Sequence, residues 1–150
     1  MKKYLYTLVL ALGVVASSTF AAAPAPKNAA TFFEIPVSDF DRAVGFYEKI
    51  LDEKLNIKAG TDYRMAFFPA ALGGVAGALT KAGDYNPSAS GTVVYLDGGE
   101  DLQVILNRVE GAGGKIAVPK MLISPEVGYF AQLIDTEGNR VGLYTPAKRE

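Results

Sequence analysis

One order of elements occurs twice along the chain, and this repeat restricts the fold more than any other feature of the sequence. A β-branched and aromatic run, TFFEIPV, leads directly into SDFDRAVGFYEKIL. Four apolar residues of the second stretch fall at helical spacing: Phe40, Ala43, Tyr47 and Ile50. The stretches KLNIKA, YRMAFFP and GVAGALTKA then read as strands separated by Gly, Asp and Pro signals. The first half therefore predicts a βαβββ unit over about 31–82.

The order restarts at GTVVYLD, which is followed by EDLQVILNRVEGAGG. This second stretch predicts a helix that ends at its glycines, and one face carries Leu102, Ile105, Leu106 and Val109. Three further strands are expected at KIAVPKMLI, GYFAQLI and RVGLYT. The second half is therefore another βαβββ unit, over about 91–146.

Two local features refine these boundaries. Ser38 is placed to cap the first helix, and Asp41 in its first turn complements the positive end of the helix dipole. Between the last two strands, DTEGN carries Gly138 and Asn139, which tolerate the positive φ of a tight hairpin.

The repeat predicts an α+β fold in a single domain over 31–146, followed by a short tail at 147–150. Ile35 and Val94 occupy matching places in the two units, 59 residues apart. A chain of 150 residues with 49% hydrophobic content is long enough for one packed core. Two such units can bury their helix-covered faces and leave a concave face for a ligand.

The N-terminus has the order of a secretory signal. Lys2 and Lys3 precede the apolar run YLYTLVLALGVVA, and small residues follow it. The alternative is a membrane anchor, but the run is shorter than the roughly 20 apolar residues of a span. We expect a signal peptide over 1–21, cleaved after Ala21, and a linker rich in Ala and Pro over 22–30. The protein would then be exported to the periplasm or secreted, without a stable membrane anchor.

Charge and composition narrow the classes of partner and cofactor. Without Lys2 and Lys3 the chain has 13 basic residues against 16 acidic ones, a net charge of −3 with no basic stripe. Nucleic acid is therefore not an expected partner. The sequence has no His and no Cys, which are the usual ligands of zinc, iron, nickel and copper. We expect no bound metal and no cofactor.

Three stretches in this order resemble the glyoxalase/bleomycin-resistance/dioxygenase superfamily, also called vicinal oxygen chelate proteins: FEIPVSDFDRAVGFYEKIL, GTVVYLD before a helix ending GAGGK, and YFAQLIDTEGNRVGLYTP. The resemblance implies that curved sheets from two modules form a cavity. It also implies that the family's enzymes hold a divalent metal there with His, Gln or Glu side chains. Those ligand positions fall here at Phe32, Gly91 and Gly142, none of which can bind a metal. The two glycines are expected to enlarge the cavity.

Strand alternation selects the residues that face this cavity. If alternate residues of TFFEIPV meet the helix, Phe32, Glu34 and Pro36 face inward. A carboxylate on an apolar wall is costly unless paired, and such groups serve as general bases. Glu34 is therefore the candidate catalytic residue and a candidate ligand contact, together with Phe32. The alternative is an ion pair with Arg64 or a lysine, or exposure at the cavity mouth.

Five further residues complete the predicted ligand-binding set. Tyr95 and Tyr144 share the inner face with the two glycines, so their rings would line the cavity and their hydroxyls could orient a ligand. Arg64, Lys120 and Tyr129 are candidates from neighbouring strands. The alternative for all the tyrosines is packing in the core or at the rim.

Three functional hypotheses remain open. The first is an exported, metal-free protein that binds a small organic molecule in an aromatic cavity. The second is a metal-independent isomerase or lyase, related to lactoylglutathione lyase, with Glu34 as general base. The third is an interaction protein that uses its outer surface. A homodimer is a further expectation, since the resemblance implies that members often complete or extend their sheets across a dimer.

Overall fold

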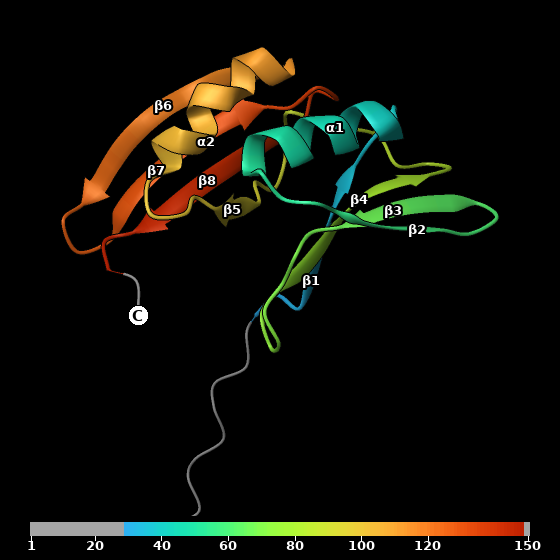
Figure 1. Cartoon of the computed structure of the whole chain (residues 1–150), viewed down its shortest axis with the longest axis horizontal. Helices are drawn as coiled ribbons and strands as arrows, with labels where there is room; N and C mark the ends of the chain where they lie inside the picture. The colour runs from blue at the N-terminus through green and yellow to red at the C-terminus, as the bar shows by residue number, and fades with distance from the viewer. Residues whose placement is uncertain (1–28, 149–150) are drawn as a thin grey trace, which may run out of the picture.

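The computed structural model describes residues 29–148. The predicted signal peptide, most of the predicted linker and the last two residues of the tail lie outside this part. In chain order the elements are β1 (Phe32–Pro36), α1 (Phe40–Leu51), β2 (Asn56–Ala59), β3 (Tyr63–Phe67), β4 (Ala76–Ala82), β5 (Tyr95–Asp97), α2 (Leu102–Val109), a 3-10 turn η1 (Glu110–Ala112), β6 (Lys115–Ser124), β7 (Gly128–Ile134) and β8 (Arg140–Pro146) (Figure 1).

The repeat appears in the sheets as well as in the element order. The first sheet has the strand order β1-β4-β3-β2 and the second has β5-β8-β7-β6, so corresponding strands occupy corresponding places. In each sheet the first strand of the module runs parallel to the last, and the remaining pairs are antiparallel. The predicted α+β fold of two βαβββ modules is confirmed. The two sheets remain separate and are not closed into a barrel.

The core lies where the two helices pack against the sheets and against each other. Figure 1 shows α1 and α2 side by side on the same side of the molecule. The apolar stripes predicted for both helices are confirmed, because all eight of their residues are buried. The rings of Phe46 and Tyr47 meet edge to face with centroids 5.0 Å apart. They belong to one hydrophobic cluster to which both modules contribute residues. Burying these faces is the main driving force that joins the modules.

Two local predictions are wrong, and a third is confirmed in part. Asp39 rather than Ser38 caps α1, since its carboxylate accepts a hydrogen bond from the amide of Arg42 at 3.1 Å. The first strand of the second module begins only at Tyr95, where register pairing with β8 starts opposite Gly142, and Gly91 lies before it with a φ of 103°. The hairpin predicted at DTEGN is confirmed between β7 and β8, and its positive φ, of 92°, lies at Gly138 and not at Asn139.

Each sheet has a second face, on the side away from the helices, which we call the open face. On the first sheet it carries Phe32, Glu34 and, by strand register, Thr80. On the second sheet it carries Tyr95, Gln132, Arg140, Gly142 and Tyr144. Within residues 29–148 no helix is both long and apolar enough to span a membrane.

Candidate functional site

A hollow of about 150 Å³ lies where the two modules meet. Its walls come from β1, from the start of β8 and from the connection that precedes β5. The lining residues are Glu34, Ile35, Pro36, Asn86, Ser88, Ser90, Thr92, Val94, Asn139, Arg140 and Val141. The hollow therefore combines two charged side chains with several hydroxyls and a few apolar surfaces.

Glu34 forms one charged wall. Its Oε1 accepts a hydrogen bond from the hydroxyl of Thr80 at 2.8 Å, and its Oε2 accepts one from the hydroxyl of Tyr85 at 2.8 Å. Thr80 is buried on the open face of β4, whereas Tyr85 comes from the loop after that strand. The hydrogen bond to Glu34 raises the pKa of Tyr85, so the phenol remains the donor at neutral pH. Two neutral donors thus fix the carboxylate at the hollow.

Arg140 is the second charged residue that lines the hollow. Its Nη1 donates to Oε1 of Gln132 at 2.9 Å, and its Nε donates to the carbonyl of Ala89 at 3.4 Å. The amide nitrogen of Gln132 in turn donates to the hydroxyl of Tyr95 at 2.7 Å. Tyr95, Gln132 and Arg140 all lie on the open face of the second sheet, so the guanidinium is the end of a polar chain.

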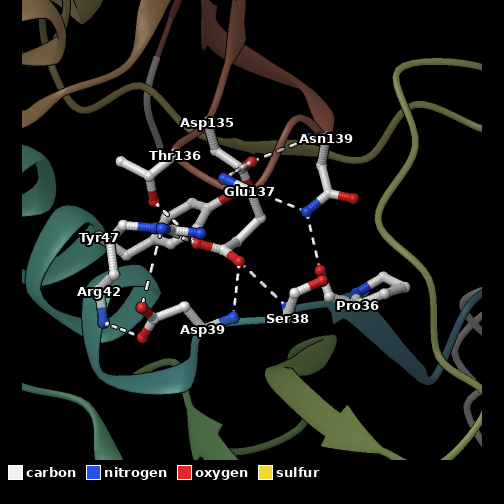
Figure 2. A network of polar contacts seen from close by, with 9 residues as sticks. All are labelled: Pro36, Ser38, Asp39, Arg42, Tyr47, Asp135, Thr136, Glu137 and Asn139. Atoms are coloured by element: carbon white, nitrogen blue, oxygen red, sulfur yellow. Dashed lines mark hydrogen bonds and ion pairs between the residues drawn. The ribbon is translucent and has the colours of Figure 1, made fainter.

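A network around the β7–β8 turn holds the two walls together (Figure 2). The side-chain amide of Asn139 donates to the carbonyl of Pro36 in β1 at 2.8 Å and to Asp135 at 2.9 Å. Asp135 also accepts a hydrogen bond from the buried hydroxyl of Tyr47 in α1 at 2.8 Å. This turn of the second module is therefore bonded to a strand and a helix of the first, which sets the position of β1 relative to β8.

Glu137 completes the network at the start of α1. Its carboxylate accepts hydrogen bonds from the amides of Ser38 and Asp39 at 3.0 and 2.8 Å, and from Nε of Arg42 at 2.8 Å (Figure 2). Burial acts to raise the pKa of Glu137, but the bonds from Arg42 and the two amides outweigh it, so the pKa is lowered. An anion at a helix N-terminus also complements the helix dipole.

Some of the sequence-predicted site residues share the open face with Glu34. Phe32 packs at a tilt against Phe67, with ring centroids 6.1 Å apart. Tyr95 belongs to the polar chain that ends at Arg140. The hydroxyl of Tyr144 donates to the carbonyl of Val127 at 2.6 Å, so it is engaged at the far end of the second sheet.

The other predicted residues lie on the helix-covered side and do not meet Glu34. Arg64 forms a two-point ion pair with Asp41 of α1 at 2.8 and 3.2 Å, so the predicted alternative of a Glu34–Arg64 pair is not formed. Lys120 bonds to Asp101 at the start of α2, at 2.7 Å, and lies 4.6 Å from the ring centre of Tyr129. The strand register places Tyr129 opposite Thr145 of β8, on the same helix-covered face.

The residues at the family's metal-ligand positions do not fit a metal ion. Phe32 offers no donor atom, and Gly91 lies outside the strand. At Gly142 a side chain would collide with the ring of Tyr95, so the expectation that this glycine enlarges the cavity is wrong. Within residues 29–148 no three His, Cys, Asp or Glu side chains converge as metal ligands would.

Sequence reasoning missed most of the polar frame of the hollow. Arg140 could have been found, because it is two residues before Gly142 on the same strand and therefore shares its face. Gln132 pairs with Gly142 across β7 and β8, which requires the strand register. Tyr85 and Asn139 act from a loop and a turn, where no periodic signal exists.

The family model "Glyoxalase/Bleomycin resistance protein/Dioxygenase superfamily" matches residues 29–143. No curated protein matches the chain at a significant level. Among solved structures, it is similar to TnmS3, an antibiotic binding protein from Streptomyces sp. CB03234, with 23% identity, a TM-score of 0.61 and coverage of 79% of this chain and 96% of that one.

Two glyoxalases are similar at lower identity. Glyoxalase I from Zea mays is 20% identical, with a TM-score of 0.63 and coverage of 79% of this chain but 45% of the maize chain. The trypanothione-dependent glyoxalase I of Leishmania major is 17% identical, with a TM-score of 0.57 and coverage of 79% and 87%. At these identities the likeness concerns the fold. The family match over most of the chain and the paired βαβββ modules together place this chain in the glyoxalase/bleomycin resistance protein/dioxygenase superfamily.

Proposed function

We propose that this chain is a binding protein that holds a small organic molecule in the hollow between its modules, without a metal ion. The observation that carries the proposal is the pair of oppositely charged side chains at one hollow, Glu34 and Arg140, each held in place by neutral partners. Pre-positioned polar groups of this kind fix the orientation of a ligand. The description of the similar protein TnmS3 as an antibiotic binding protein supports a binding role.

The aromatic side chains of the open face extend this site. Phe32 and Tyr95 are 41% and 44% exposed although they are large and apolar. Exposed apolar patches mark ligand or partner sites, and these two rings support such a role for the open faces. We include in the proposal a homodimer in which the second copy covers the open faces. Sedimentation of the cleaved protein tests this part, since a monomer at all concentrations would contradict it.

We also propose export, on the basis of the leader alone. Cleavage after Ala21 would release the domain into the periplasm or the medium. N-terminal sequencing of the secreted or periplasmic protein tests the cleavage site, and recovery of the uncleaved chain in membranes would favour an anchor instead.

The alternative function is a metal-independent isomerase or lyase in which Glu34 acts as general base. Its specific support is that Glu34 lines the hollow and pairs with no Lys or Arg among residues 29–148. Glu34→Gln would then abolish turnover of a substrate that the wild type converts, while retaining the fold. Unchanged turnover in that variant would remove Glu34 from the mechanism.

The first experiment is native mass spectrometry of the mature protein, followed by extraction of small molecules and elemental analysis. The proposal predicts a retained organic compound and less than 0.1 metal ion per chain. Stoichiometric metal would overturn the metal-free part of the proposal. Arg140→Gln should lose the compound, whereas Arg64→Gln, which changes the same residue type on the helix-covered side, should retain it.

A further inference from the structure

The charges at the hollow suggest the chemical class of its ligand, and this inference rests on the proposed binding function. Glu34 belongs to β1 of the first module, and Arg140 begins β8 of the second. Both line the hollow, yet no ion pair within 4.0 Å joins them. The site therefore presents a negative and a positive group that do not neutralise each other directly.

Both groups keep capacity for further hydrogen bonds. A carboxylate has about four acceptor positions, and Glu34 uses one on each oxygen for Thr80 and Tyr85. A guanidinium has five N–H donors, and Arg140 commits one to Gln132 and one to Ala89. Neutral partners thus orient each charged group without satisfying it. A ligand can complete both.

The remaining lining limits the size and polarity of that ligand. The hollow measures about 150 Å³ and is partly open to solvent, which suits a small ligand or one end of a larger one. Ser88, Ser90 and Thr92 supply a polar wall, while Val94 and Val141 supply apolar contact for a short carbon chain. A large aromatic ligand could touch this hollow only with a polar end.

We propose that the hollow binds a small zwitterion, with an ammonium group at Glu34 and a carboxylate at Arg140. A short amino acid has this chemistry. A ligand with only one charge would leave the other charged group of the protein without a counter-charge in a partly buried site, which is costly. Arg favours a carboxylate in particular, because its planar fork can donate two parallel hydrogen bonds.

Isothermal titration calorimetry of the mature protein tests this class directly. The probes are glycine, β-alanine, 4-aminobutyrate and 5-aminopentanoate, which separate the two charges by increasing numbers of carbons. Butyrate and butylamine are the matched half-ligands, each with one charge removed. We expect at least one zwitterion to bind 10-fold or more tightly than either half-ligand. Equal binding of a half-ligand, or no binding of any zwitterion, would overturn the assignment.

Variants of Glu34 and Arg140 test which protein group binds each end of the zwitterion. Glu34→Gln and Arg140→Gln should each weaken the best zwitterion at least 10-fold, whereas Arg64→Gln should change its affinity less than 2-fold. Circular dichroism checks that the variants fold. The comparison of zwitterions with half-ligands uses the wild-type protein alone, so it stands even if a variant does not fold. If the protein retains another compound but binds no zwitterion, this inference fails and the proposed function survives. If it retains nothing and binds nothing, both fail.

Discussion

Tyr47→Phe removes a single oxygen from the network that joins the modules, and its cost can be worked out from the structure. The Tyr47 hydroxyl is completely buried and donates to Asp135 at 2.8 Å. Asp135 keeps its other donors, the side chain and amide of Asn139 and the amide of Glu137. A hydrogen bond to a charged group contributes about 1.5–3 kcal/mol. We therefore expect the free energy of unfolding to fall by about that amount.

Urea denaturation followed by far-UV circular dichroism measures this change, because the chain has no Trp to report by fluorescence. Tyr63→Phe is the matched control: its ring is 47% exposed and its hydroxyl has no hydrogen bond among residues 29–148. The control should change stability by less than about 0.5 kcal/mol. If Tyr47→Phe were equally neutral, the bond to Asp135 would not hold the modules together.

The stability of Tyr47→Phe should also differ from that of wild type at high pH. Burial, and then the nearby charge of Asp135, raise the pKa of Tyr47 well above its ordinary value of 10.0. Because the folded pKa is raised, this contribution to stability is fully present below about pH 10 and is lost as the pH rises towards the folded pKa. Wild type should therefore lose more stability above pH 10 than Tyr47→Phe. Parallel curves for the two proteins would contradict this assignment.

Two further predictions concern packing and acid stability. Gly114→Ala should destabilise the fold by about 1–3 kcal/mol in the same urea assay, because its Cβ would lie 2.6 Å from the Phe46 ring. The matched control is Gly111→Ala, whose Cβ would meet nothing within 4 Å and which should be as stable as wild type. Since the pKa of Glu137 is lowered from 4.5, its contribution is fully present above about pH 4.5 and is lost as the pH falls through the folded pKa. Thermal melts from pH 6 to pH 3 should therefore show a smaller loss for Glu137→Gln than for wild type, and equal losses would exclude Glu137 as a source of acid sensitivity.

The sequence was sufficient for the modules because helical and strand periodicities are local. Both apolar helix stripes could be read directly, and so could the inward position of Glu34 on β1. The face of Arg64 could not be read in the same way. In YRMAFFP apolar residues stand on both faces, so alternation does not fix which face meets the helix. The structure turns Arg64 and Ala66 towards α1 and leaves Met65 on the open face.

The network at the β7–β8 turn could not be predicted from local sequence, for a different reason. Ser38 and Asp39 are both good caps, and sequence gives little ground for choosing between them. The choice is tertiary, since the amide of Ser38 donates to Glu137, 99 positions along the chain. Asn139 suits a hairpin by type, yet its side chain bonds to Pro36 and its backbone takes no positive φ. Contacts between modules set these roles.

Gly142 stands at the position where the family resemblance implies a metal ligand, and its surroundings can be tested by mutation. The ring of Tyr95 covers this glycine, and its hydroxyl receives the bond that continues through Gln132 to Arg140. Gly142→Ala should force the ring away and cost about 1–3 kcal/mol in urea unfolding. Adding Gly142→Ala to Tyr95→Ala should cost much less, because the collision is gone, so the two changes would be non-additive. Additive costs would mean that Tyr95 does not occupy the space above Gly142, and that Arg140 is positioned without it.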